Sequence, residues 1–279
     1  MAQASLLEAP ELAVERIDAR AAGENFPVVS LLAPRWARPH LRAIYGFARL
    51  VDNLGDEAEG DRGALLDELD RELDGRARTD LMRRLHATIE ACGLPREPFA
   101  RLIEANRIDQ VKKRYETWKE VRKYCTYSAD PVGRLVLGVY GRADDRDAVA
   151  LSDSICTGLQ LVNFIQDPPR DLALGRVYLP QEDLMRFGVR DDNLAGPLTS
   201  EIAALLAFES ARARELLVNG LPLRGMLGGR PGMSVALYVR GGLAALDELE
   251  GAGWDVFTGR PVPSRARFAL LAIRELVRP

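Results

Sequence analysis

Apolar residues recur at helical spacing along almost the whole of this 279-residue chain. In residues 38–52, for example, Leu41, Ile44 and Ala48 fall on one face of a helix. Strand-like alternation bounded by hairpin turns is almost absent. The pattern therefore predicts an all-α fold. The expected helices cover 38–52, about 65–73 and 81–91, 97–113, 116–127, 131–140, 145–167, 199–219, 232–251 and 264–277.

No internal repeat, low-complexity tract or Pro/Gly-rich linker divides the chain, so we expect a single domain over residues 1–279. The glycine-rich stretch 227–232 is expected to be a loop between helices. It lacks the GxGxxG order and no strand precedes it, which leaves a dinucleotide-binding fold unsupported.

The composition narrows the classes of function. A net charge of −3 gives nucleic acid no obvious attraction to the chain. No apolar run approaches the roughly 18 residues of a membrane-spanning helix, and acidic residues interrupt the N-terminal apolar stretch, which argues against a signal peptide. Three widely separated cysteines indicate reduced thiols in the cytoplasm, and two histidines argue against a multi-histidine zinc site.

Two pairs of aspartates stand four residues apart, Asp52 with Asp56 and Asp167 with Asp171. Residues at this spacing lie one above the other on a helix face, where two carboxylates repel each other unless a cation lies between them. Two such helices facing one another would form a cage of oxygen ligands for Mg²⁺. The alternatives are a solvated acidic helix end for the first pair and an ordinary amphipathic helix for the second.

The neighbouring residues favour a site that acts on a diphosphate. Asn163 extends the second pair into a polar stripe within an apolar helix, and Arg176 follows a glycine where it can reach phosphate oxygens. Such a site can ionise a C–O bond and hold the resulting carbocation between apolar helices. The aromatic rings that could stabilise the cation, or simply pack in the core, are Phe26, Tyr45, Phe47 and Phe164.

These segments resemble the squalene/phytoene synthase family from about Glu24 to Arg267. The first acidic motif of the family is met by Tyr45, Arg49, Asp52, Asp56 and Glu57, and the second by Gln160, Asn163, Asp167 and Asp171. Three further family strings are met by Gly175 to Pro180, by Tyr124-Cys125 with Val132-Gly133, and by Gly253 to Phe257 with Arg260.

The resemblance implies an isoprenoid-synthase domain of helices around a central apolar cavity, with Mg²⁺ as cofactor and a prenyl diphosphate as substrate. It implies that Tyr45, Tyr124 and Gln160 line the reacting end, that Arg49, Gln166, Arg176 and Arg260 engage the diphosphate, and that Asp52, Asp56, Asn163, Asp167 and Asp171 hold the metal.

Shorter strings at 24–28, 38–40, 128–134 and 239–242 resemble the bacterial hopanoid-locus branch of the family, the hydroxysqualene (squalene) synthases. That branch implies ionisation of presqualene diphosphate and capture of the rearranged cation by water, without a reductant. One alternative is head-to-head synthesis of squalene, dehydrosqualene or phytoene from two prenyl diphosphates. Another is a non-catalytic assembly factor of the same fold.

Two features depart from the family pattern. Asn53 stands where many members have a second aspartate, which removes one charge from the first cluster. Pro168 and Pro169 interrupt the second pair, so we expect the helix to end at or near Gln166 and the stacking of Asp171 on Asp167 to be uncertain.

A long hydrocarbon product must reach the bilayer, so we expect a transient peripheral contact with the inner membrane and a possible handoff to neighbouring pathway enzymes. The candidate surface is the apolar stretch from Leu221 to Leu227, whose alternative is an ordinary segment packed on the domain.

Overall fold

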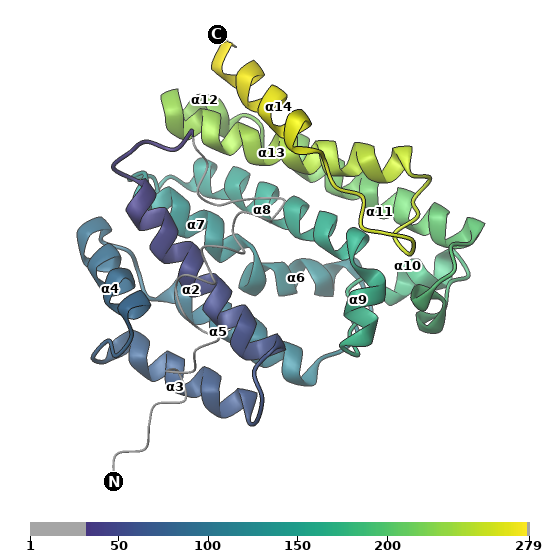
Figure 1. The fold of residues 1–279 in the computed structure, drawn as a ribbon, viewed down its shortest axis with the longest axis horizontal. Helices are drawn as coiled ribbons and strands as arrows, with labels where there is room; N and C mark the ends of the chain where they lie inside the picture. Colours follow the sequence, from purple (N-terminus) through teal and green to yellow (C-terminus); the bar gives the residue numbers. More distant parts are fainter. Residues whose placement is uncertain (1–31, 278–279) are drawn as a thin grey trace.

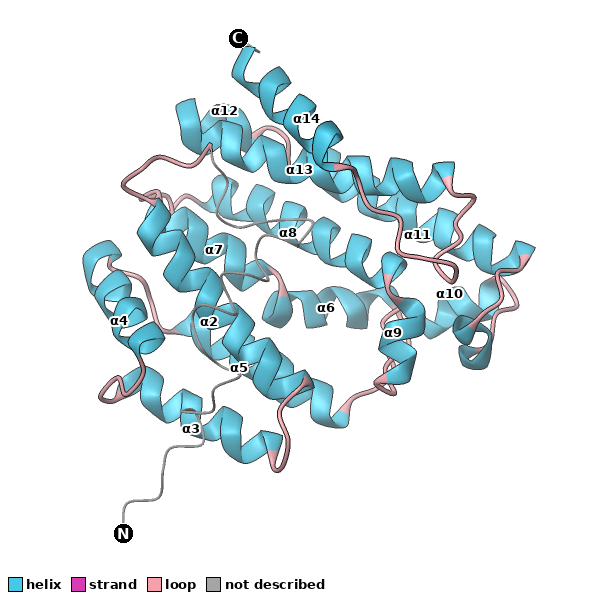
Figure 2. Cartoon of the chain, in the orientation of Figure 1, coloured by secondary structure: helices cyan, strands magenta, loops and turns pink. Residues whose placement is uncertain are grey.

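The computed structural model describes residues 32–277, and all of their regular secondary structure is helical, as predicted. Figure 1 and Figure 2 show the helices packed around α8, with the described C-terminal end on the outside. The helices are α2 (Arg38–Asp56), α3 (Arg62–Asp74), α4 (Asp80–Cys92), α5 (Glu97–Val111), α6 (Trp118–Ser128), α7 (Asp130–Val139), α8 (Arg146–Gln166), α9 (Pro168–Ala173), α10 (Gln181–Arg186), the 3₁₀ turn η3 (Asp191–Ala195), α11 (Ser200–Asn219), α12 (Leu223–Leu227), α13 (Gly229–Gly251) and α14 (Arg265–Val277).

Two hydrophobic clusters form the described core. One gathers side chains of α2, α3, α4, α5 and α7, and the other gathers side chains of α6, α8, α11 and α13 with the loop after α9. Helix α8 packs against α6, α7, α11 and α13, which places the polar residues at its C-terminal end at the edge of this core. The central apolar cavity and the single domain over 1–279 stay predictions.

Helix α8 is long and apolar enough to cross a membrane by length and composition, although the sequence predicted no such span. Half of its most apolar window is buried among the other helices, as is common for the central helix of a folded core. It is the single described helix that meets this test.

The prediction of a loop over residues 227–232 was wrong, because Gly228 alone separates α12 from α13. Gly228 takes a φ of 60°, which reverses the chain, and Pro231 falls in the first turn of α13, where a missing N–H costs no helical hydrogen bond. A Cβ at Gly232 would lie 2.1 Å from the carbonyl oxygen of Arg224, so this glycine lets the two helices approach closely.

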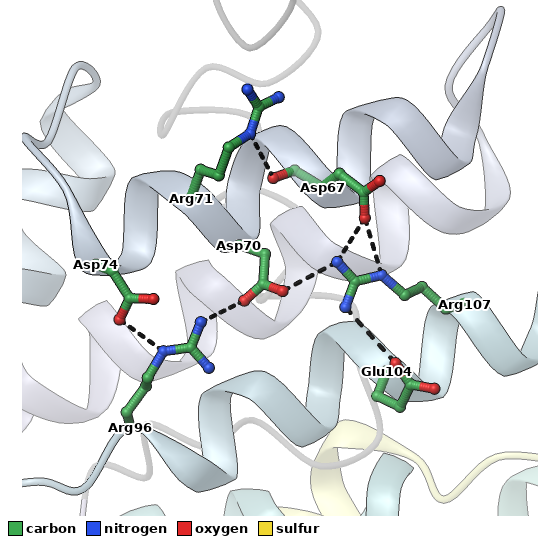
Figure 3. A network of polar contacts seen from close by, with 7 residues as sticks. All are labelled: Asp67, Asp70, Arg71, Asp74, Arg96, Glu104 and Arg107. Carbon is green, nitrogen blue, oxygen red and sulfur yellow. Dashed lines mark hydrogen bonds and ion pairs between the residues drawn. The ribbon is translucent and has the colours of Figure 1, made fainter.

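Arginine–aspartate contacts tie α3 to α5 (Figure 3). Arg96 lies 2.7 Å from Asp70 and 2.6 Å from Asp74, and Arg107 lies 3.0 Å from Asp70 and 2.6 Å from Asp67. Most of these side chains are well exposed, so each pair contributes little stability by itself. The network joins α3 to α5, the helix on which α2 packs.

Candidate active site

Helix α2 carries the first acidic motif on one face. It runs past the predicted end at residue 52 to Asp56, so Asp52 and Asp56 both lie within the helix and one turn apart. Arg49 approaches Asp52 to 3.7 Å, while the Asp52 side chain keeps 52% of its surface exposed. Tyr45 lies two turns before Asp52 and is buried. The site face of α2 therefore runs from the core at Tyr45 to solvent at Asp52.

The second acidic motif crosses from α8 to α9. Helix α8 ends at Gln166, as the two prolines predicted, and α9 begins at once with both prolines in its first turn. Asp167 caps both helices. Its N–H donates to the carbonyl of Asn163 at 2.9 Å, and its own carbonyl accepts from the N–H of Asp171 at 2.9 Å. The i to i+4 hydrogen-bond register is thus kept, and Asp171 lies one turn beyond Asp167.

Burial, followed by the nearby charge of Asp167, raises the pKa of Asp171 to about 8. Burial also raises the pKa of Asp167, against the opposing effect of Arg260. Both carboxylates therefore lie where their charged forms are costly without a cation.

Arg176 connects the two motifs. Gly175 takes a φ of 77°, which lets the chain turn back after α9, and the N–H of Arg176 donates to the carbonyl of Asp171 at 2.8 Å. The buried guanidinium then donates through Nη1 to Asp56 Oδ1 at 2.5 Å. Arg176 and Asp56 both act on the pKa of Asp171. The loop after α9 thus brings the two motifs together, because Asp56 of the first motif lies close enough to Asp171 of the second to affect its pKa.

Asp109 of α5 is a buried acid that the sequence analysis missed. Its Oδ2 accepts a hydrogen bond of 2.5 Å from the Tyr124 hydroxyl and lies 4.0 Å from Arg176 Nη1. Burial raises the pKa of Asp109 to about 6, and its Oδ1 finds no hydrogen-bond partner within residues 32–277. The available signal was helical register, because Asp109 stands seven residues after Leu102 on the buried face of α5.

Four aromatic rings pack against one another next to Asp109, which Tyr124 contacts. The ring centroids of Phe164 and Tyr178 are 4.2 Å apart and nearly parallel, and Tyr124 lies 5.4 Å from Tyr178. Tyr115 completes the group at 5.9 Å from Tyr178. Among the rings that the sequence proposed for a cation, Phe164 lies in this stack. Phe47 instead packs edge-on against Phe99 in the other core cluster, and Phe26 lies outside the described residues.

The loop between α13 and α14 covers the end of α8. Arg260 lies 2.8 Å from Asp167 and donates to the amide oxygen of Asn163 at 3.4 Å. Gln166 is buried and donates to the carbonyl of Pro261 at 2.6 Å, so one of its amide hydrogens already holds this loop in place. Gln160 is half-buried on α8, one turn before Phe164.

The carboxylate and amide oxygens of the site fit a Mg²⁺ ion that also binds water and phosphate oxygens. Within the described part of the chain, no three His, Cys, Asp or Glu side chains already form a group that could hold a metal. Mg²⁺ commonly uses one or two carboxylates and takes its other ligands from water and substrate phosphates. The raised pKa of Asp171 identifies a carboxylate that a divalent cation would favour in its charged form.

Residues 19–267 match the family profile described as squalene/phytoene synthase. The chain belongs to this family. It is 37% identical over 211 residues to a hydroxysqualene synthase of Sinorhizobium fredii, covering 74% of this chain and 71% of that protein. A hydroxysqualene synthase of Rhodopseudomonas palustris is 38% identical over 207 residues, covering 72% and 70% of the two chains.

Solved structures agree with this assignment. The crystal structure of squalene synthase HpnC from Alicyclobacillus acidocaldarius has 46% sequence identity and a TM-score of 0.77, covering 87% of this chain and 94% of that one. A dehydrosqualene synthase in complex with ligand has a TM-score of 0.82 at 22% identity and supports the fold alone. The chain is therefore an enzyme of the squalene/phytoene synthase type, in the branch that the sequence resembled, and the non-catalytic alternative is set aside.

Proposed function

We propose that this enzyme ionises presqualene diphosphate in a Mg²⁺-dependent reaction and lets water capture the rearranged cation, giving hydroxysqualene. The C–O bond to the diphosphate breaks, the oxygen of a water molecule forms a new bond to carbon, and one proton is released, so no reductant is needed. The observation that carries the proposal is the meeting of Asp56, Asp171 and Arg176, because it joins both acidic motifs around one arginine.

The polar groups would bind and orient the diphosphate. Mg²⁺, held by Asp52, Asp56, Asn163, Asp167 and Asp171, would supply positive charge that stabilises the diphosphate as a leaving group. Arg176 is buried and already oriented, which suits it to donate to phosphate oxygens from a fixed position. Arg49 and Arg260, which pair with Asp52 and Asp167, would add further donors.

The aromatic stack would accommodate the hydrocarbon end. The ring centroids of Tyr124 and Phe164 lie 5.4 Å and 4.2 Å from that of Tyr178, and aromatic faces attract cations where water is excluded. Asp109 would hold the Tyr124 hydroxyl in one orientation through their 2.5 Å hydrogen bond. Similarity to two hydroxysqualene synthases supports capture of the cation by water as the final step.

The test measures diphosphate release from presqualene diphosphate, with and without Mg²⁺, and identifies the product by mass spectrometry. Asp171→Asn should lose most activity. The matched control is Asp74→Asn, because Asp70 and Asp74 are also four apart but bind Arg96, the residue directly before α5. Equal activity in wild type and Asp171→Asn, or a product without the hydroxyl group, would contradict the proposal.

A second candidate is head-to-head condensation of two prenyl diphosphates. The chain is 32% identical over 241 residues to a phytoene synthase of Thermus thermophilus, covering 85% of this chain and 82% of that protein. Supplying C15 and C20 prenyl diphosphates separately distinguishes the candidates, since hydrocarbon formed from them without added presqualene diphosphate would favour condensation. We propose in addition that the enzyme lies in the cytoplasm and passes its product to neighbouring enzymes of the pathway.

A further inference from the structure

The string 128–134, one of those that resemble the hydroxysqualene synthase branch, spans the junction between α6 and α7. Its charged side chains already have partners. The pairs are Asp130 with Arg122 at 2.8 Å, Asp130 with Thr157 at 2.8 Å, and Arg134 with Asp153 at 2.7 Å. These contacts join the junction to α8 and satisfy the charged members of the string.

The hydroxyl of Ser128, the last residue of α6, is left out of these pairs. Its Oγ is buried and finds no hydrogen-bond partner within residues 32–277. Buried hydroxyl groups are normally paired with a protein group or with an ordered water molecule, because an unpaired one costs free energy. Ser128 is therefore suited to bind a small polar molecule.

Ser128 lies on the side of α6 that carries Tyr124. Residues four apart on a helix lie one above the other, so one turn separates the two side chains on the same face. The ring of Tyr124 belongs to the aromatic stack and lies 6.4 Å from that of Phe164 on α8. Under the proposed function this stack accommodates the hydrocarbon, which places the Ser128 hydroxyl beside the reacting chain.

Helix α8 packs against α6 and runs antiparallel to it (Figure 1). The ring contact one turn before Ser128 reaches α8 at Phe164, and the carboxylate contact just after it reaches α8 at Thr157. The α8 neighbours of Ser128 therefore lie between these two residues. Gln160 stands within this interval, half-buried, one turn before Phe164 and on the same face. Its amide both donates and accepts hydrogen bonds.

We propose that Ser128 and Gln160 hold the water molecule that captures the cation, a role that rests on the proposed function. The water donates one hydrogen bond to Ser128 Oγ and accepts one from the Gln160 amide, which leaves one lone pair and one proton unengaged. The lone pair forms the new C–O bond, and the proton passes to the diphosphate released by ionisation. Two fixed partners also select the carbon that is attacked, because the water reaches only the carbon that faces it.

The experiment supplies presqualene diphosphate with Mg²⁺ and measures diphosphate release together with the ratio of alcohol to hydrocarbon product. Ser128→Ala should lower this ratio about tenfold, the effect of one lost hydrogen bond, because a cation without its water loses a proton instead. Diphosphate release should stay close to the wild-type rate, since ionisation precedes capture. Ser128→Thr keeps the hydroxyl and should keep the ratio, whereas Gln160→Leu should lower it.

The matched control is Thr126→Ala, which removes a hydroxyl from the same turn of α6. Thr126 Oγ1 already donates to the carbonyl of Lys123 at 2.7 Å, so its loss should leave the ratio unchanged. Thermal melts establish that each variant is folded before products are compared.

An unchanged ratio in Ser128→Ala or in Gln160→Leu would overturn the proposal. Equal falls in Ser128→Ala and Thr126→Ala would also overturn it, because a general disturbance of α6 would then explain the change. A wild type that forms no alcohol at all refutes the proposed function itself. The two failures are therefore distinguishable in one assay.

Discussion

Replacing Asp109 by asparagine should make the protein more stable and less active. The pKa of this buried carboxyl moves from an ordinary value of 3.8 to about 6 in the fold. At about 1.4 kcal/mol for each pKa unit, the charged form is disfavoured by about 3 kcal/mol relative to the unfolded chain. Arg176 and the Tyr124 hydroxyl offset only part of the burial cost. Asparagine has the same shape, can still accept from Tyr124, and carries no charge to bury.

The sign follows from proton linkage. Between pH 3.8 and about pH 6, folded wild type keeps a proton on Asp109 that the unfolded chain has released. This contribution to stability is full below pH 3.8 and is lost as the pH rises to about 6. The stability advantage of Asp109→Asn should therefore grow across this window and then level off, at about 1–3 kcal/mol, or a few degrees in melting temperature.

Urea unfolding of both proteins at intervals from pH 4 to pH 8 measures this difference directly. Tyr124→Phe is the companion variant. It removes the hydroxyl donor and leaves the charge of Asp109 without its hydrogen bond, so it should lower stability at neutral pH. A stability difference between wild type and Asp109→Asn that stays constant with pH would refute the reasoning. Diphosphate release should fall in both variants, because Asp109→Asn removes the negative charge beside Arg176 and Tyr124→Phe removes the hydroxyl that Asp109 orients.

Three further predictions concern binding and packing. Mg²⁺ with inorganic pyrophosphate should raise the melting temperature of wild type, and in calorimetry near pH 7 binding should release a proton, because the pKa of Asp171 is about 8 and its charged form binds the cation; Asp171→Asn should release less. Gly55→Ala should destabilise the protein by about 1–3 kcal/mol in chemical unfolding and weaken activity, because the new Cβ would lie 1.9 Å from Asn106 Oδ1 between α2 and α5; Gly63→Ala, with no comparable contact on α3, is the control. Glu275→Ala should cost about 2–4 kcal/mol by leaving two arginines without their buried partner, and hydrogen exchange should show faster opening of α14 than of α8.

The helices and both acidic motifs could be predicted because apolar periodicity and motif order are local properties of a sequence. Spacing alone could not identify the site. Asp70 and Asp74 are also four apart on a helix, yet arginines on the surface satisfy them. The contact between Asp56 and Arg176 depends on how distant helices pack, so it appears only in three dimensions.

Asp109 was missed for the same reason. It belongs to none of the strings that resemble the family, and its importance comes from burial beside Tyr124 and Arg176. The restart of the helix after Gln166 depends on Asp167 acting as a cap for two helices, a role that proline rules do not predict. The sequence correctly predicted that the helix ends at Gln166, but it did not predict that α9 begins directly after Asp167.

The charge pattern explains why a cation and a diphosphate should bind together. Three arginines of the site already lie within ion-pair distance of three aspartates. The pairs are Arg49 with Asp52, Arg176 with Asp56, and Arg260 with Asp167. A divalent cation alone would have to displace arginines that then lack an anion, and a diphosphate alone would meet the carboxylates. A ligand that brings both charges satisfies every group at once, because the carboxylates take the cation while the arginines take the phosphate oxygens. A site built in this way favours a ligand that carries both charges over the cation or the diphosphate alone.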